Sequence, residues 1–343
     1  MRIPASFKHI LVRLSTVLVC IVAFAGPQVA FAGKPYQYFV VGDPTDVVIQ
    51  PHHPLEPSLV LMGGGPDVDD AFKWMINKSG GGNFVVIRAS GTDAYNPYIY
   101  AMGGVSSIET IIIPSRDAAN DPFVISRIKG AEALFIAGGD QSDYINNWQG
   151  TLVESALQYL TSKNIPIGGT SAGMSVMGQY TFAALKGTIT SPSALSNPYD
   201  KAVTLGRDFL TLPNMNGLIT DPHLDSRDRM GRLITFMARI VNDGWSVMAR
   251  GIGVDVETAL LMDNGTASLV GVGSAYFLQT VGMPEVCKPK TPLTYRNLSV
   301  QRLSGTGTFD MNNWVGYGNS TTNYSISAIE GMLLSTQAGG AIY

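Results

Sequence analysis

Ile167-Gly168-Gly169-Thr170-Ser171-Ala172-Gly173-Met174 is a short apolar strand that runs into a helix through a serine with small neighbours. A serine on such a sharp turn has its hydroxyl lifted clear of the sheet, and the crowded backbones around it require small residues. Gly169, Ala172 and Gly173 supply that small size. We interpret Ser171 as a nucleophile and the amide of Ala172, at the helix start, as a donor to a developing oxyanion. An ordinary glycine and serine turn is the alternative.

Apolar strands alternate with helices upstream of this turn. We expect strands over residues 58–62, 83–88, 108–113 and 133–137. Continuous apolar strands separated by helices are typical of an α/β fold, a mainly parallel sheet covered by helices on both faces. Ligands of such folds bind beyond the carboxyl ends of the strands. Three glycine-bearing turns lie there, at 63–65, 138–139 and 168–173, and none has the spacing of a dinucleotide or P-loop motif.

Helices are predicted from the spacing of apolar residues. Residues 121–129 form one, and residues 143–162 form another that breaks near Gly150. Helical spacing also continues beyond the serine, from Met174 to Tyr180. The domain boundaries that we predict are residues 1–32, 33–290 for the α/β domain, and 291–343 for a small β-rich extension with alternating polarity.

The first 32 residues have the composition of a secretory signal. Arg2, Lys8 and Arg13 precede an apolar run over residues 17–25, and small residues lead to a predicted cleavage after Ala32. The run is short for a membrane span, so we expect a secreted or periplasmic protein with no membrane partner, an uncleaved anchor being the alternative. One cysteine, Cys287, follows the signal, which excludes an intramolecular disulfide and a cysteine metal cluster in the mature chain.

The charge of the mature chain disfavours a nucleic-acid partner. Removing residues 1–32 removes three of the 23 basic residues and none of the 26 acidic ones, which leaves a formal charge of −6. Proteins that bind nucleic acid carry basic patches or a basic net charge.

A serine nucleophile needs a base, which is almost always histidine. The mature chain has three: His52, His53 and His223. The first two lie among prolines and are expected on the surface. His223 lies at a turn that leads into a helix continuing to Ile240, and we assign it as the base, a hydrogen-bonded histidine at a helix start being the alternative. It follows Ser171 by 52 residues, which is short for an α/β-hydrolase.

Three blocks of the sequence, taken together, resemble the cyanophycinase and dipeptidase E family of serine peptidases. They are residues 169–173, Gly138-Gly139-Asp140-Gln141, and the pattern Asp-x-His-x-x-x-Arg-x-Arg-x-Gly-Arg from Asp221 to Arg232, and the similarity extends over roughly residues 58–262. The resemblance implies a class I glutamine amidotransferase-like, flavodoxin-like α/β sandwich. It also implies hydrolysis of peptide bonds at aspartyl groups, including the β-linked groups of cyanophycin, without a metal or organic cofactor.

The resemblance assigns roles to individual residues. Ser171 matches the nucleophile, His223 the base, and Ala172 with Gly139 the oxyanion hole. Four more residues match positions expected to face the substrate: Gln141, Asp221, Arg227 and Arg229. A guanidinium fork suits the free carboxylate of an aspartyl substrate. The alternative for Arg227, Arg229 and Arg232 is a solvated helix face with Asp225 and Asp228 as partners.

The orienting acid of the family is missing at its usual place. That residue lies shortly after the serine, yet residues 172–199 contain neither Asp nor Glu. We predict Asp200 as its replacement, because the proline in Asn197-Pro198-Tyr199-Asp200 could order a loop that holds the carboxylate against the imidazole. A backbone carbonyl, or the hydroxyl of Thr188 or Thr190, is the alternative. Loss of the acid from a serine protease lowers turnover about 10⁴-fold.

Two other functions compete with a peptidase that acts on aspartyl peptides. One is a secreted α/β-hydrolase-like esterase, against which stand the short spacing of serine and histidine and the absence of a His-Gly-Gly motif before the serine. The other is a non-catalytic relative that binds acidic peptides. The extension 291–343 is expected to cover a sheet edge or to form the contact of a possible homodimer.

Overall fold

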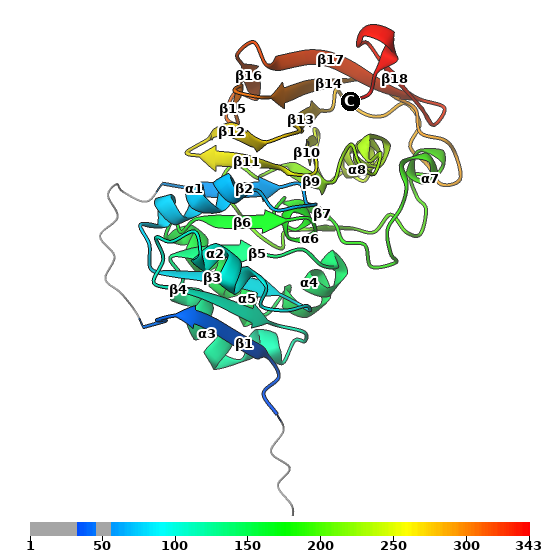
Figure 1. Cartoon of the computed structure of the whole chain (residues 1–343). Coiled ribbons are helices and arrows are strands. Elements are labelled where there is room, and N and C mark those ends of the chain that lie inside the picture. Colours follow the sequence, from blue (N-terminus) through cyan, green and yellow to red (C-terminus); the bar gives the residue numbers. More distant parts are fainter. Residues whose placement is uncertain (1–32, 46–55) are drawn as a thin grey trace, which may run out of the picture. The chain divides into compact units, whose positions relative to one another are not determined.

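Strand β6 (Ile167–Thr170), which carries the serine turn, lies inside a ten-stranded sheet. The computed structural model describes residues 33–45 and 56–343, and residues 34–343 form one compact unit (Figure 1). The predicted signal and two of the candidate bases, His52 and His53, fall outside the described residues.

The ten-stranded sheet has a parallel centre. Five neighbouring strands, in the order β4-β3-β5-β6-β2, run parallel, and antiparallel strands extend both edges. Besides β6, this sheet contains β1 (Gln37–Gly42), β2 (Ser58–Met62), β3 (Asn83–Arg88), β4 (Ser107–Ile112), β5 (Ala133–Ile136), β11 (Thr258–Asp263), β12 (Thr266–Gly271), β15 (Thr308–Asp310) and β16 (Val315–Tyr317). The predicted α/β class with a mainly parallel sheet is confirmed for this central part.

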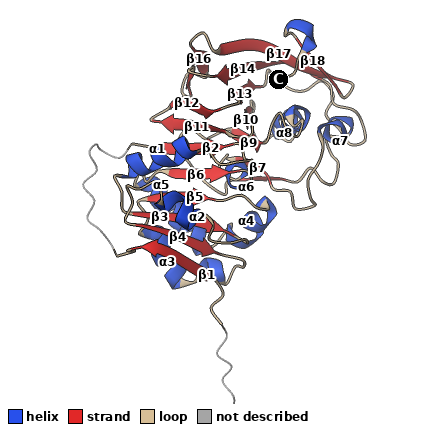
Figure 2. Ribbon diagram, in the orientation of Figure 1, coloured by secondary structure: helices blue, strands red, loops and turns tan. Residues whose placement is uncertain are grey.

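Helices cover both faces of the parallel strands (Figure 2). Alternate side chains of each strand face opposite layers, so Val60 and Met62 pack with α1 (Asp69–Ser79) and α2 (Tyr95–Tyr100). Leu59 and Leu61 pack on the other face, where three helices lie: α3 (Pro122–Lys129), α4 (Gln141–Trp148) and α5 (Leu152–Ser162). The predicted break near Gly150 separates α4 from α5.

A second sheet of eight strands adjoins this core. Its order is β18-β17-β14-β13-β10-β9-β7-β8, with β9 parallel to both β10 and β7. The strands are β7 (Tyr180–Phe182), β8 (Leu205–Arg207), β9 (Leu218–Pro222), β10 (Arg250–Val254), β13 (Ser274–Gln279), β14 (Tyr295–Ser304), β17 (Thr321–Ile329) and β18 (Met332–Ser335). The remaining helices of the described residues are η1 (Ala118–Asn120), α6 (Ala172–Ser175), α7 (Ser191–Ser196), α8 (Met230–Asn242) and η2 (Ala338–Gly340).

Residues 291–343 form the predicted β-rich piece, and its strands continue both sheets. Strand β14 pairs with β13, and β15 pairs with β12, so each sheet gains strands at an existing edge. This arrangement agrees with the expectation that the extension covers sheet edges. Within residues 33–45 and 56–343, no helix combines the length and the apolar character that crossing a membrane requires.

The helix after the serine is shorter than predicted. Helix α6 covers only Ala172–Ser175, and the chain then turns into β7 at Tyr180. The apolar residues Val176 and Met177, whose spacing suggested a longer helix, are buried in the core by the turn itself. Burial in a turn and burial on a helix face produce the same short apolar pattern.

Candidate active site

The serine turn has the strained backbone that its small neighbours predict. Ser171 has φ 51° and ψ −118°, a conformation that is unusual for a residue with a side chain. A Cβ atom on Gly169 would lie 2.7 Å from the carbonyl carbon of Gly173, and one on Gly173 would overlap the Ile136 carbonyl oxygen. Glycine is therefore required at both positions for the chain to close around Ser171.

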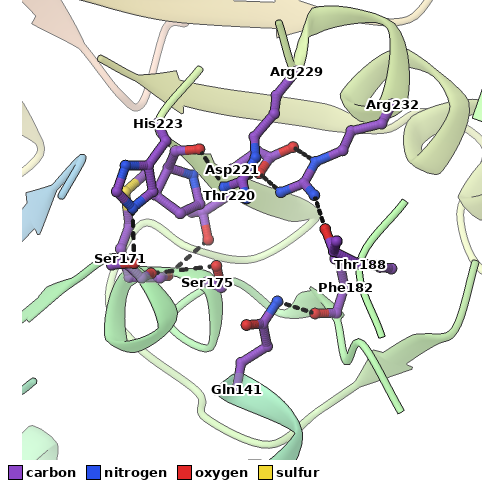
Figure 3. A network of polar contacts seen from close by, with 12 residues as sticks. Gln141, Ser171, Ser175, Phe182, Thr188, Thr220, Asp221, His223, Arg229 and Arg232 are labelled. Carbon is purple, nitrogen blue, oxygen red and sulfur yellow. Dashed lines mark hydrogen bonds and ion pairs between the residues drawn. The ribbon is translucent and has the colours of Figure 1, made fainter. Parts of the chain in front are cut away.

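The hydroxyl of Ser171 meets the imidazole of His223 (Figure 3). Ser171 Oγ lies 2.9 Å from His223 Nε2, although the two residues follow different strands of different sheets. His223 comes directly after β9, with φ 50°, and its amide donates to the Gly63 carbonyl at 2.8 Å. The structure thus brings together the predicted nucleophile and the predicted base.

The glycine turn at residues 63–65 packs against this imidazole. Gly64 has φ +89°, and a Cβ atom on it would overlap Cε1 and Nε2 of His223. In this turn, which lies beyond a strand end where ligands of such folds bind, Gly64 lets the backbone approach the side chain of His223.

His223 is neutral at physiological pH. Burial lowers the pKa of its imidazole to about 4, with further lowering from the positive charges of Arg227, Arg229 and Arg232 and a smaller opposing effect of Asp225. A neutral imidazole can accept the proton of a serine hydroxyl.

None of the residues predicted to orient His223 contacts it. In the part of the chain that the structure describes, no hydrogen bond reaches Nδ1 of the imidazole. The Asp200 carboxylate accepts from the Ala202 amide at 2.9 Å, because a short side chain in a turn bonds most readily to the backbone two residues on. Thr188 Oγ1 accepts from Arg232 at 3.1 Å, and Thr190 caps α7. The structure therefore does not bring the Asp200 carboxylate to the imidazole of His223.

An acid that the sequence analysis missed supports the turn that carries His223. Asp255 directly follows β10, the parallel neighbour of β9, and is 5% exposed. Its carboxylate accepts from the Asp225 amide at 3.2 Å and from the Ser274 amide at 3.0 Å. Burial, together with the charge of Asp225, raises the pKa of Asp255 to about 7. The sequence signal that could have drawn attention to Asp255 is its place directly after the strand residues Gly251-Ile252-Gly253-Val254.

Asp221 holds two arginines through its buried carboxylate. Its carboxylate, 2% exposed, pairs with both Nε and Nη2 of Arg232, the Nε contact being 2.8 Å. Arg229 Nη1 lies 3.7 Å from the same carboxylate and donates to the Pro222 carbonyl at 2.8 Å. Arg232 is also 2% exposed, so the alternative of a solvated helix face does not hold for it. In this structure the Asp221 carboxylate is occupied by Arg232, with Arg229 nearby, so its role towards a substrate remains a prediction.

A cavity of about 360 Å³ opens beside Ser171. Six of the residues that line it were assigned to the catalytic, oxyanion or substrate-binding groups from the sequence: Gly139, Gln141, Ser171, Ala172, Arg227 and Arg229. Gln141, the first residue of α4, donates through its side-chain amide to the Phe182 carbonyl at 3.2 Å. Residues 187–190 also line the cavity.

Arg227 carries a positive charge that no neighbour neutralises. It is exposed on the cavity wall, and among the described residues its guanidinium forms neither a hydrogen bond nor an ion pair. Arg229 and Arg232, by contrast, are both held by Asp221. Within the part of the chain that the structure describes, the guanidinium of Arg227 is therefore free near the serine, which suits an anionic ligand.

These features define the class of the protein: an α/β fold with a serine and histidine pair at the carboxyl edge of a parallel sheet, beside an arginine-lined cavity. The model of peptidase family S51 matches residues 59–270, and the chain belongs to this family. The resemblance inferred from the three sequence blocks is thereby confirmed.

Relatives of known name cover part of the chain. A cyanophycinase from Trichormus variabilis is 27% identical over 212 residues, which are 60% of this chain and 66% of that protein. A cyanophycinase from Synechococcus elongatus is 28% identical over 174 residues, 50% of this chain and 49% of its own length. The matched segments thus span between about half and two thirds of these relatives.

A solved structure is also similar to part of the chain. It is a peptidase from an acI-B1 Actinobacterium, with 16% identity and a TM-score of 0.47, and the similarity covers 67% of this chain and 96% of that one.

Proposed function

We propose that the protein is a serine peptidase that hydrolyses peptide bonds at aspartyl or β-aspartyl groups through an acyl-enzyme on Ser171. The observation that carries this proposal is the 2.9 Å contact between Ser171 Oγ and Nε2 of a neutral His223, at the mouth of a cavity with a free guanidinium. Membership of peptidase family S51 supports the reaction class.

The first half of the reaction forms the acyl-enzyme. His223 Nε2 takes the proton of the Ser171 hydroxyl while Oγ bonds to the scissile carbonyl carbon, whose oxygen becomes an oxyanion. The amides of Ala172 and Gly139, both on the cavity lining, donate to that oxyanion. His223 then gives its proton to the leaving nitrogen as the carbon–nitrogen bond breaks.

The second half releases the acid product. A water molecule takes the place of the amine, His223 accepts one of its protons, and the oxygen bonds to the acyl carbon. The bond to Ser171 Oγ breaks, and the serine recovers its proton from His223. Side chains and backbone amides of this chain supply every step.

The charges around His223 favour an acidic substrate. Arg227, Arg229 and Arg232 all lower the pKa of the imidazole. A substrate carboxylate bound at Arg227 would neutralise part of this positive charge, and the imidazole would become a stronger base when the cavity is filled. Aspartyl peptides carry such a carboxylate. Cyanophycin, an aspartate backbone with arginine side groups, is the substrate that the names of the relatives suggest.

The test is the release of amino groups from cyanophycin and from matched α-aspartyl and β-aspartyl dipeptides. We expect turnover on at least one aspartyl substrate by the wild type and none by Ser171→Ala. Equal turnover by the two proteins would reject Ser171 as the nucleophile. Turnover of short acyl esters without any turnover of aspartyl peptides would favour the esterase.

A non-catalytic relative is the second candidate, because no described residue bonds to Nδ1 of His223. Such a protein would bind acidic peptides without hydrolysing them. Calorimetric binding of a β-aspartyl dipeptide, combined with no amine release by the wild type, would identify it.

Export and self-association are further proposals. Residues 1–32 have the composition of a secretory signal, so we propose a secreted or periplasmic protein whose mature chain begins at Gly33. The intact mass of the protein recovered from the exported fraction tests this, and a mass that includes residues 1–32 would contradict it. Sedimentation velocity of the mature protein tests the homodimer.

A further inference from the structure

The last residues of the sequence return to the turn that bears the active-site arginines. Tyr343 Oη donates to the Asp228 carboxylate at 2.9 Å and accepts from the Met230 amide, the first of α8, at 3.1 Å. Figure 1 shows this end of the chain beside α8. The contact thus joins the β-rich extension to residues 223–229, far from it in sequence.

Neighbouring contacts fix the position of Tyr343. Its ring packs edge-on against Tyr276 of β13, with centroids 6.0 Å apart and an interplanar angle of 88°. Tyr324 of β17 donates to the Ile342 carbonyl at 2.9 Å. Burial raises the pKa of the Tyr343 phenol, so the hydroxyl stays protonated and remains a donor. The sheet therefore presents this hydroxyl at a defined place.

Asp228 is the carboxylate that could neutralise the free arginine. It lies between Arg227 and Arg229 in the sequence, on the same turn, and its φ is 46°. Its amide donates to the Asp225 carbonyl at 2.9 Å, and its carbonyl accepts from Ser191. Within the described chain, neither arginine forms an ion pair with it. Among the described residues, Tyr343 donates the only hydrogen bond that the Asp228 carboxylate accepts.

We propose that Tyr343 is a positioning residue, which holds the Asp228 carboxylate away from Arg227 and so keeps that guanidinium free for the carboxylate of the substrate. This inference rests on the proposed function, because it concerns the acidic specificity of the same cavity. It also gives residues 291–343 a role: their strands carry Tyr343 to the active-site turn.

The test measures binding in the Ser171→Ala background, where no substrate is consumed. The probe is a β-aspartyl dipeptide, and its Kd is measured by isothermal titration calorimetry. We expect Tyr343→Phe, which removes one hydroxyl and keeps the ring, to raise Kd about three- to tenfold, the size of a partly exposed charge interaction. Binding of the corresponding peptide with its carboxylates amidated should not change.

A second substitution separates charge competition from loosening of the fold. Asp228→Asn removes the competing charge, so adding it to Tyr343→Phe should return Kd to within about twofold of the parent. Tyr295→Phe is the matched control. Tyr295 lies in β14, in the sheet whose β13 and β17 contact the last residues of the chain, and its hydroxyl donates to the Gly282 carbonyl at 2.7 Å. In the active enzyme, Tyr343→Phe should raise KM for aspartyl substrates and leave kcat unchanged.

Each other outcome overturns the proposal in a recognisable way. An unchanged Kd in Tyr343→Phe rejects the role of Tyr343 and leaves the proposed function intact. A raised Kd that Asp228→Asn does not restore shows a structural role only. If the Ser171→Ala parent does not bind the dipeptide at all, the proposed acidic specificity fails, and this inference fails with it.

Discussion

The imidazole of His223 rests directly on the backbone of Gly64, so that even a methyl group on Gly64 would overlap Cε1 and Nε2 of the ring. This contact, together with the bond from the His223 amide to the Gly63 carbonyl, places Nε2 beside the Ser171 hydroxyl. Packing and backbone contacts orient this base, where many serine peptidases use an acid.

We expect Gly64→Ala to displace the imidazole and to lower kcat/KM by about 100-fold, because misplacement of a catalytic group by 1 Å can have that effect. Gly65→Ala is the matched control. Gly65 also has positive φ, +79°, but its Cβ would lie 3.1 Å from Val256 and not against the histidine. Both variants should lose about 1 kcal/mol of stability from the strained backbone. Equal activities in the two variants would show that the contact of Gly64 with the His223 ring does not matter for catalysis.

The pH dependence of kcat/KM should have its acidic limb near pH 4. His223 must be neutral to accept the serine proton, and burial with the nearby arginines lowers its pKa to about 4, so activity is lost as the pH falls through that value. Arg227→Gln removes one of these positive charges and should move the limb to higher pH. A limb near 6.5 in the wild type would contradict the environment described here.

Protonation of His223 should also affect stability. Its folded pKa lies below the unfolded value of about 6.5, so the unfolded chain binds the proton more readily and stability falls as the pH falls from about 6.5 to about 4. Urea unfolding across this window should show a smaller pH dependence for His223→Gln than for the wild type. The same slope in both proteins would assign the effect to other groups.

Asp221→Asn should destabilise the protein by about 3–5 kcal/mol, because it leaves the buried guanidinium of Arg232 without its carboxylate partner. Glu285→Gln provides the comparison. The pair that Glu285 forms with Arg296 is nearly half exposed and should contribute at most about 1 kcal/mol. Urea unfolding of both variants measures the difference. A loss below 1 kcal/mol in Asp221→Asn would mean that Arg232 finds another partner or water.

Asp255→Ala should lower kcat/KM by about 10- to 100-fold, because the turn that carries His223 would lose the acceptor of the Asp225 amide. Asp255→Asn keeps one acceptor oxygen and should lose no more than a few-fold. Steady-state kinetics on an aspartyl dipeptide gives both values. Wild-type activity in Asp255→Ala would remove Asp255 from the account.

The parts of the site that could be predicted from the sequence are those that local chemistry determines. The strained turn at Ser171 requires small neighbours, and these are adjacent in the chain. The α/β class followed from continuous apolar strands. The pairing of Ser171 with His223 was accessible by elimination and by resemblance, since few histidines were available.

The other parts depend on contacts between distant segments. Asp255 supports the histidine turn because β10 lies next to β9, an order that no local pattern reveals. Asp200 does not reach the imidazole in this structure, where its carboxylate bonds to a nearby amide in its own turn. Asp221 was predicted to bind the substrate, and in the structure its carboxylate accepts a hydrogen bond from Arg232 in the first turn of α8. The hydrogen-bond partners of Asp200 and Asp221 follow from the folded structure and not from the sequence pattern.

The most direct test of the central claim is labelling of the wild type and His223→Ala with a fluorophosphonate, followed by mass spectrometry of the modified peptide. A serine activated by the adjacent imidazole should be labelled once per chain, at Ser171. In His223→Ala the rate of labelling should fall by at least about 100-fold. Labelling of Ser171 at the same rate in both proteins, or no labelling of Ser171 in a wild type that still hydrolyses aspartyl peptides, would contradict the account.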